Sequence, residues 1–422
     1  MHRPKRLMLL FAVFALVAAA CGSSDSDTTT TTTGAPAATT TTAGAAATTT
    51  TSTQPADTSP IIIGAAVDLS QNMLPFNTPA NTAAKIMVDR INAAGGVLGG
   101  RQLELVTIDS TVEPDLVKSA AVDLISQGAE ILLVTCDFDF AAPAIQEALA
   151  ANILVVAPCI GTDRMGPVGL GAAGKIAFSF GNQAQDEGAV LAEFSRDQGW
   201  ENAVVVKDNL LVYFQDVVDA FDVRFTENGG TVVATEQFSS FDGTIGNVVT
   251  AVANIADKDV IAISTAFDDL PALVLGLRSL GDNTPIVCSW ACDYTQWMGE
   301  DLNNFYYNTF VSIYGDDPDP DVNAFIQEMV DLGEPPFSAA LLGGAQSLQA
   351  IADAIEATGG TDAVALANYL EGLGTTSLVF GDITLNADNH TVFGRPHRMM
   401  GVTDSQPAYK ETRTASSPAV IR

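Results

Sequence analysis

The feature that most constrains the fold of this chain is an alternation of short apolar runs with longer amphipathic segments. Residues 61–67 and 131–134 are continuous apolar runs, which are typical of strands buried on both faces. The segment 82–94 has apolar residues at every third or fourth position, which indicates a helix with one buried face. Because strands that alternate with helices form βαβ units, the sequence predicts an α/β fold with parallel sheets.

The alternation occurs twice, with an interruption around a predicted connection at 178–183. A chain of 422 residues is long enough for two or three domains, so two doubly wound parallel-sheet lobes are expected. A helix-rich stretch follows at 321–371, and a strand is predicted at 378–385. The other predicted strands are 61–67, 102–108, 131–134, 153–157, 203–207, 231–234, 260–264 and 285–288; the helices between them are 82–94, 113–127, 142–151, 214–228, 245–256 and 269–280.

The N-terminus has the pattern of an export signal. A basic start, Met1–Arg6, precedes an apolar run at 7–19, which is too short for the roughly 20 residues that span a bilayer. We therefore predict a signal peptide at 1–20. The sequence Ala-Ala-Ala-Cys that ends at Cys21 resembles the lipobox of bacterial lipoproteins, although Ala18 stands where Leu is usual. The resemblance implies lipidation of Cys21; the alternative is a secreted protein cleaved after an Ala-x-Ala site.

Residues 21–60 are rich in Thr, Ala, Ser, Gly and Pro and show no apolar periodicity. Such a segment cannot bury enough apolar surface to offset the entropy lost on ordering. We interpret it as a disordered tether between a membrane anchor and the folded part.

The charge and histidine content exclude several classes of function. The chain has 19 basic and 50 acidic residues, a net charge of −31, so binding to nucleic acid through a basic surface is not expected. His2, His390 and His397 are the only histidines, which argues against histidine zinc sites and His-based catalytic triads. The first strand is not followed by G-x-G-x-x-G, and no G-x-S-x-G is present. We expect no metal, no cofactor and no enzymatic activity.

Several segments, taken in order, resemble one known family. They are Ile-Asn-Ala-Ala-Gly-Gly-Val-Leu-Gly-Gly-Arg at 91–101, Ile-Leu-Val-Val-Ala-Pro at 153–158, the 227–233 segment beginning Glu-Asn-Gly-Gly, and Asp-Ile-Thr-Leu-Asn-Ala-Asp-Asn at 382–389. Over residues 61–402 the chain resembles the leucine/isoleucine/valine-binding group of ABC-importer substrate-binding proteins, which have the type I periplasmic-binding fold. The resemblance implies two lobes joined by a three-crossing hinge, with a ligand cleft between them.

The resemblance also implies the lobe boundaries. The first lobe would comprise 61–179 and 311–373, the second 180–310 and 374–410, and residues 411–422 would form a C-terminal tail. The expected partners are a small-molecule ligand and ABC permease subunits in the membrane. We expect an extracytoplasmic monomer, anchored to the cell membrane as a lipoprotein.

Two functions fit this resemblance. One is the extracellular solute-binding component of an ABC importer, which captures a small polar ligand, either an amino acid or an amine- or amide-type compound, by lobe closure. The alternative is a ligand-sensing extracellular receptor of the same fold that signals to a membrane partner. A third hypothesis, from another class of function, is a secreted enzyme or a surface structural protein.

The ligand site is expected at the carboxyl ends of the strands. Where the family has a Ser/Thr run that binds the ligand carboxylate, this chain has Asp and Phe, which disfavours an ordinary branched-chain amino acid. Aromatic side chains and a few acids in these loops favour a ligand with an amine or cationic group, although any one aromatic residue could instead belong to a lobe core. The candidate ligand-binding residues are Asp137, Phe138, Asp139, Thr162, Tyr213, Phe267, Trp290 and Asp293.

Four cysteines besides Cys21 form an even set in an exported chain, which favours disulfides. Cys136 and Cys159 both follow predicted parallel strands that could be neighbours. Cys288 and Cys292 would close a small loop. We predict these two pairings; the alternative is four buried free thiols.

Overall fold

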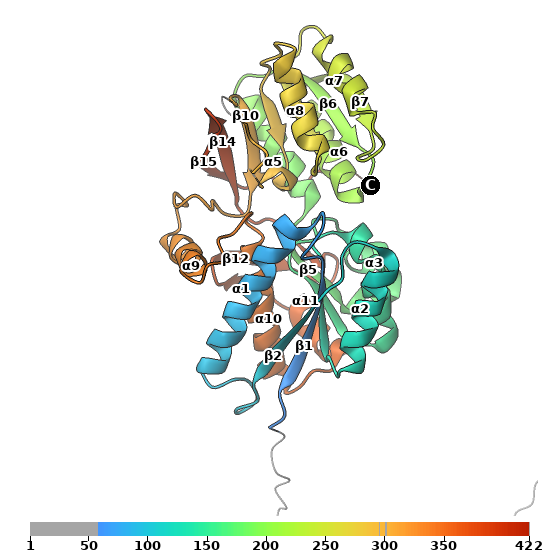
Figure 1. Ribbon diagram of the computed structural model, residues 1–422, viewed down its shortest axis with the longest axis vertical. Helices are drawn as coiled ribbons and strands as arrows, with labels where there is room; N and C mark the ends of the chain where they lie inside the picture. The colour runs from blue at the N-terminus through green and yellow to red at the C-terminus, as the bar shows by residue number, and fades with distance from the viewer. Residues whose placement is uncertain (1–57, 295, 300–301, 422) are drawn as a thin grey trace, which may run out of the picture. The chain divides into compact units, whose positions relative to one another are not determined.

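The computed structural model describes residues 58–294, 296–299 and 302–421, which fold into two α/β lobes (Figure 1). Both lobes lie within one compact unit of the chain. Residues 1–57, with the predicted signal peptide, Cys21 and most of the tether, lie outside the described residues. In the described part, no helix is long and apolar enough to cross a membrane.

The first lobe is built on a parallel sheet of six strands in the order β13-β5-β4-β3-β1-β2. Helices α2 and α3 cover one face of this sheet, and α1, α10 and α11 cover the other. The strands are β1 Ile61–Val67, β2 Leu103–Asp109, β3 Ile131–Val134, β4 Leu154–Ala157, β5 Ala177–Asn182 and β13 Thr391–Val392; the helices are α1 Leu74–Ala93, α2 Pro114–Ser126, α3 Phe138–Ala151, α4 Pro167–Leu170, α10 Leu341–Thr358 and α11 Ala363–Glu371, with a 3-10 turn at Gly171–Ile176.

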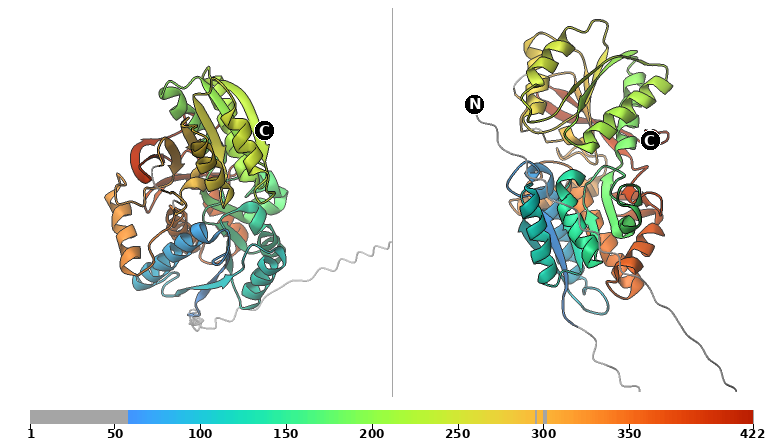
Figure 2. Two further views of the ribbon diagram at one scale, coloured as in Figure 1. Left: turned by 45° about the horizontal axis from the view of Figure 1, so that its top comes forward. Right: turned by 90° about the vertical axis from the view of Figure 1, so that its right-hand side faces the viewer.

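The second lobe is built on a seven-stranded sheet in the order β15-β14-β10-β9-β8-β6-β7. It is parallel except for β14 and β15, which form an antiparallel edge. Helices α5 and α6 cover one face, and α7 and α8 cover the other (Figure 2). The strands are β6 Asn202–Asp208, β7 Thr231–Phe238, β8 Val260–Ser264, β9 Ile286–Cys288, β10 Phe305–Thr309, β14 His397–Thr403 and β15 Gln406–Arg413; the helices are α5 Ala184–Asp197, α6 Val212–Glu227, α7 Ile245–Ala253 and α8 Asp269–Ser279, with a 3-10 turn at Trp290–Cys292.

The chain crosses between the lobes three times: from β5 into α5, from β10 into α9 (Pro320–Asp331), and from β13 into β14. The predicted fold, two doubly wound lobes joined by a three-crossing hinge, is confirmed. The antiparallel edge of the second sheet was not predicted, because β14 and β15 come from the C-terminal part of the chain, far in sequence from the strands they extend.

Buried Arg395 lies on the third crossing, between β13 and β14, and contacts residues of the other two crossings. Its guanidinium donates to the Phe180 carbonyl at 3.0 Å, to Asn182 Oδ1 at 2.7 Å and to Gln346 Oε1 at 2.6 Å. It also lies 5.5 Å from the ring centroid of Phe310, on the second crossing. Burial, and then the charge of Arg398, lower its pKa to about 9, so the guanidinium remains charged at neutral pH.

Several predicted elements differ from the observed ones. Helix α1 begins at Leu74 and α3 at Phe138, earlier than expected, and the predicted connection at 178–183 is largely β5. Helix α5, which was not predicted, contains buried charged residues that break the apolar pattern.

The predicted strand at 378–385 is instead a hairpin of β11 (Gly374–Leu378) and β12 (Gly381–Leu385). This hairpin belongs to the first lobe, so the expected boundary at 373/374 is wrong. Its apolar side chains join the core of the first lobe, and Gln346 on α10 donates to its turn. The boundary at 179/180 shifts likewise, because β5 continues to Asn182 in the first sheet.

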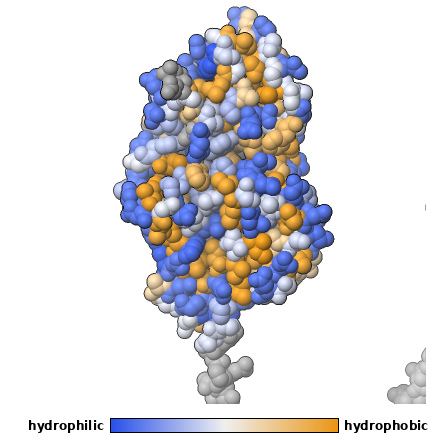
Figure 3. Space-filling model, viewed as in Figure 1, coloured by the Kyte–Doolittle hydropathy of each residue, from blue (hydrophilic) through white to orange (hydrophobic). Residues whose placement is uncertain are grey.

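The predicted tail at 411–422 is part of the second lobe as far as it is described. Residues 411–413 belong to β15, and the guanidinium of Arg224 on α6 donates to Ser416 and Ser417. On the face seen in Figure 3, hydrophilic and hydrophobic residues are interspersed over both lobes.

Candidate functional site

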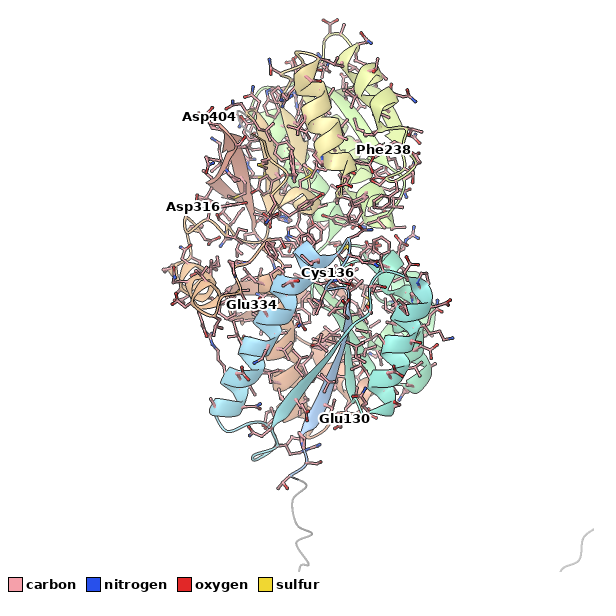
Figure 4. All side chains as sticks on the ribbon, in the orientation of Figure 1. Glu130, Cys136, Phe238, Asp316, Glu334 and Asp404 are labelled. Atoms are coloured by element: carbon pink, nitrogen blue, oxygen red, sulfur yellow. A yellow bond between two sulfur atoms is a disulfide. The ribbon has the colours of Figure 1, made fainter. Side chains whose placement is uncertain are left out.

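A cavity lies between the two lobes at the carboxyl ends of β3, β6, β8 and β9. The room that it leaves for the centre of a water molecule is about 20 Å³, within about 280 Å³ of space that atoms do not fill, some of it open to solvent. Figure 4 labels Cys136, one of its lining residues, at the junction of the lobes. Its walls are mostly apolar and aromatic and come from both lobes: Met73, Phe76, Cys136, Asp137, Leu211, Tyr213, Phe214, Ala266, Phe267, Trp290 and Ala291. The position agrees with the rule that ligands bind at strand carboxyl ends in open α/β sheets.

Asp137 supplies the acidic group of the cavity wall. It is the N-cap of α3, and its Oδ1 accepts from the backbone N–H groups of Asp139 at 2.9 Å and Phe140 at 3.1 Å. Burial, and secondly the charge of Asp139, raise the pKa of Asp137 to about 7, against the lowering effect of these hydrogen bonds. The group can therefore be either neutral or charged near neutral pH.

Tyr213 and Trp290 are positioned by a buried glutamate that the sequence analysis missed. Glu187, on α5, accepts from the Tyr213 hydroxyl at 2.8 Å and from the Trp290 backbone N–H at 3.0 Å, both through Oε2. Burial raises the pKa of Glu187 to about 8, while these two hydrogen bonds act in the opposite direction. Sequence alone offered no signal for this role, because an acid in the first turn of a helix is ordinarily solvated.

Two stacks of aromatic rings support the walls, and each includes a ring that lines the cavity. The Trp290 ring stacks on Phe310 with centroids 4.6 Å apart and lies 5.0 Å from Phe76 of the other lobe. The Phe267 ring stacks on Phe241 at 5.2 Å and meets Phe140 of the first lobe edge-on at 6.4 Å. The aromatic residues thus bring the two lobes into contact at two places beside the cavity.

Of the eight candidate ligand-binding residues, the structure places Asp137, Tyr213, Phe267 and Trp290 on the cavity wall. Phe138 packs against the core between α2, α3 and the first sheet. The remaining three are hydrogen-bonded to the opposite lobe: Asp139 accepts from Val212 N–H, Thr162 donates to Asp216, and Asp293 accepts from Ala339 N–H. Whether any of the eight contacts a ligand remains a prediction.

Both predicted disulfides are present. Cys136 pairs with Cys159, with Cα atoms 4.7 Å apart, and Cys288 pairs with Cys292 at 6.1 Å. The first joins the loops that follow neighbouring strands β3 and β4, so it fixes one wall of the cavity. The described residues contain no cluster of side chains that could hold a metal ion.

Lowering the pH from about 8 to 6.5 is expected to raise the melting temperature of the protein. The pKa values of buried Glu187 (about 8), Asp137 and Asp293 (each about 7) and Asp186 (about 6) all lie above the ordinary 3.8 to 4.5, with burial the leading cause. The folded state therefore binds more protons than the unfolded state, and its stability is lost as pH rises through these values.

Below pH 6.5 buried His397 opposes this effect, since burial lowers its pKa to about 3 and the unfolded state then binds the extra proton. Differential scanning calorimetry between pH 6.5 and 8 measures the trend, and Glu187→Gln should flatten it. A melting temperature that is constant or that falls on acidification would contradict the raised pKa values of these buried acids.

The two doubly wound lobes, the three crossings and a cavity walled by both lobes define a two-lobed solute-binding protein. The chain belongs to the periplasmic binding protein family, whose model matches residues 60–407. This membership places it among binding proteins and not among enzymes, as expected. No curated protein sequence matches the chain.

Solved structures of the same fold agree with this membership. A branched-chain amino acid transporter substrate-binding protein LivJ from Streptococcus pneumoniae, in complex with isoleucine, is 21% identical over 84% of this chain and 99% of its own, with a TM-score of 0.72. A leucine-binding protein LivK from Thermotoga maritima is 18% identical over 83% and 98%, with a TM-score of 0.71. An ABC-transporter solute-binding protein from Rhodopseudomonas palustris, in complex with 3,4-dihydroxybenzoic acid, is 15% identical over 86% and 99%, with a TM-score of 0.72. At these identities the likeness establishes the fold.

Proposed function

We propose that this protein is the extracytoplasmic solute-binding component of an ABC importer, which delivers a small ligand to permease subunits in the membrane. The observation that carries the proposal is the cavity between the lobes, since its walls come from both lobes and a ligand held there would stabilise their closure. The transport role is supported by the names of the structurally similar proteins. We further propose that the protein acts as a monomer.

We infer that the ligand carries a hydrogen-donating or cationic group facing Asp137, with its apolar or cationic part against Tyr213, Phe267 and Trp290. Aromatic faces attract cations, and a buried carboxyl group favours a donor over a second carboxylate. A screen by thermal shift against amino acids, polyamines, amides and ureas tests this inference. A ligand at about 100 times its dissociation constant should add about 2.7 kcal/mol to the free energy of unfolding.

Once the screen identifies a ligand, Phe267→Ala is expected to weaken its binding at least tenfold, about 1.4 kcal/mol. The reason is the loss of a ring that lines the cavity and is held between aromatic neighbours of both lobes. Phe241→Ala is the matched control, because Phe241 stacks on Phe267 but is 54% exposed and does not line this cavity. Isothermal titration calorimetry measures both. Equal affinities for Phe267→Ala and the wild type would place the ligand elsewhere.

We also propose that Cys21 is lipidated and anchors the protein through the Thr-rich tether. In a bacterium that processes lipoproteins, the wild-type chain should partition into the detergent phase of Triton X-114, and Cys21→Ala should remain in the aqueous phase. If both partition alike, the protein is secreted without a lipid anchor.

A further inference from the structure

We propose that Asp139, Asp216 and Asp293 act as closure residues. Each carboxylate accepts a hydrogen bond from the opposite lobe, so together they set the balance between open and closed lobes. This inference rests on the proposed function, because it assigns what tunes the affinity of the same cleft. It changes the role expected for Asp139 and Asp293, from ligand contacts to positioning residues.

Asp139 reaches from the first lobe to the second. It lies in the first turn of α3, and its Oδ2 accepts from the backbone N–H of Val212 at 2.9 Å. Val212 is the first residue of α6, and the N-cap residue Leu211 provides no side-chain cap. The first N–H groups of a helix have no partner within it and attract negative charge. A carboxylate of one lobe therefore supplies the missing cap of a helix in the other.

Asp293 makes the reciprocal contact from the second lobe to the first. It is 1% exposed, just after the Trp290–Cys292 turn, and its Oδ2 accepts from the backbone N–H of Ala339 at 2.6 Å. Ala339 lies immediately before the N-cap of α10, which also has no side-chain cap. Opening the cleft would separate this pair and expose both groups to water.

Asp216 adds a third contact. It lies on α6 in the second lobe and is 6% exposed, and its Oδ2 accepts from the hydroxyl of Thr162 at 3.0 Å. Thr162 is fully buried in the loop after β4 of the first lobe and is held there by Thr391, which donates to its carbonyl at 2.9 Å. The Thr162 hydroxyl is therefore directed across the cleft toward the second lobe.

The three contacts favour closure of the lobes for the same physical reason. Hydrogen bonds to a carboxylate are stronger than neutral ones. The Asp216 and Asp293 pairs are buried in the closed arrangement, whereas the Asp139 carboxylate is exposed. Each pair joins the lobes through protein atoms alone, so it favours closure by the same amount whatever ligand the cavity holds. Loss of a pair should lower the affinity for all ligands by one common factor, whereas loss of a cavity wall residue should change the selectivity.

The test is made on the full chain without added ligand. Spin labels at Leu116→Cys on α2 and Leu280→Cys at the end of α8, both exposed, report the distance between the lobes by electron double resonance. We expect Asp293→Ala to lower the ratio of closed to open molecules at least fivefold, and Asp139→Ala, whose carboxylate is exposed, to lower it by a smaller factor. Hydrogen exchange of the Ala339 and Val212 amides should accelerate by a similar factor in the respective variant.

Two control variants separate closure from general damage. Asp293→Asn keeps an acceptor oxygen and should restore much of the closed population. Asp259→Ala removes a carboxylate that accepts from the Glu201 and Asn202 N–H groups within the second lobe, and it should leave the distance between the lobes unchanged.

Two results would overturn the proposal. The first is that distances and exchange rates in Asp139→Ala, Asp216→Ala and Asp293→Ala match the wild type. The second is that Asp259→Ala changes the distance between the lobes as much as these variants do. A ligand screen without hits, combined with the expected shifts, would contradict the transport role and leave the closure residues standing. Failure of the proposed closure residues can therefore be distinguished from failure of the proposed transport role.

Discussion

Replacement of Arg395 by alanine is expected to lower the free energy of unfolding by about 3–5 kcal/mol. The guanidinium is buried and donates to the Phe180 carbonyl and to the side chains of Asn182 and Gln346. Without it, three buried acceptors lose their donor, and each unsatisfied acceptor costs about 1–3 kcal/mol. Removal of a buried positive charge offsets part of this loss, so the expected range lies in the lower part of the summed cost of the three acceptors.

Urea unfolding followed by circular dichroism measures the effect. Arg395→Lys should recover part of the stability, because an ammonium group keeps the charge but cannot reach all three acceptors in one plane. Arg413→Ala is the control: its partly buried guanidinium pairs with the exposed side chains of Asp197 and Glu411, and pairs with exposed groups contribute about 1 kcal/mol or less. If Arg395→Ala is no more destabilising than Arg413→Ala, the hinge does not depend on this residue.

Gly343→Ala is expected to destabilise the protein by about 3 kcal/mol, at the upper end of the usual cost of overpacking. Gly343 lies in the first turn of α10, where the helix presses on the end of β4. A Cβ atom there would overlap the carbonyl oxygen of Pro158, which is backbone and cannot rotate away. The helix would have to move, and with it the packing of α10 against α1 and β5.

Gly246→Ala provides the comparison, because Gly246 is also helical, in α7, but a Cβ atom would meet nothing within 4 Å. That change should be neutral or should stabilise the protein by about 0.5–1 kcal/mol through the lower entropy of the unfolded chain. Thermal unfolding of both variants checks the pair. Similar melting temperatures for both would mean that α10 can shift at little cost.

Much of the fold could be predicted from the sequence, because strand and helix periodicity are local properties. The apolar runs 61–67, 131–134 and 260–264 form the strands β1, β3 and β8 at those bounds. The elements that were missed depend on distant partners. Helix α5 buries Asp186 and Glu187 against the hinge and the cavity wall, and the hairpin at 374–385 belongs to the first lobe only because it packs on α10.

The sequence predicted which loops form the candidate site, but it did not predict which of their side chains line the cavity. Strand carboxyl ends converge in any doubly wound sheet, so Asp137, Tyr213, Phe267 and Trp290 were expected near a cleft. Which side chains line the cavity depends on contacts between the lobes. Asp139 and Asp293 come from similar loops but are directed at backbone N–H groups of the opposite lobe.

The sequence by itself determined the α/β class, the two lobes and the cysteine pairs, because each follows from residue spacing or from the order of neighbouring strands. Only the tertiary structure decided which acids line the cavity, which join the lobes and which position aromatic rings. The carboxylates of Asp137, Glu187 and Asp293 are chemically almost alike. Their roles differ because burial and the nearest donor, supplied by residues up to a hundred positions away, are set by how the lobes meet.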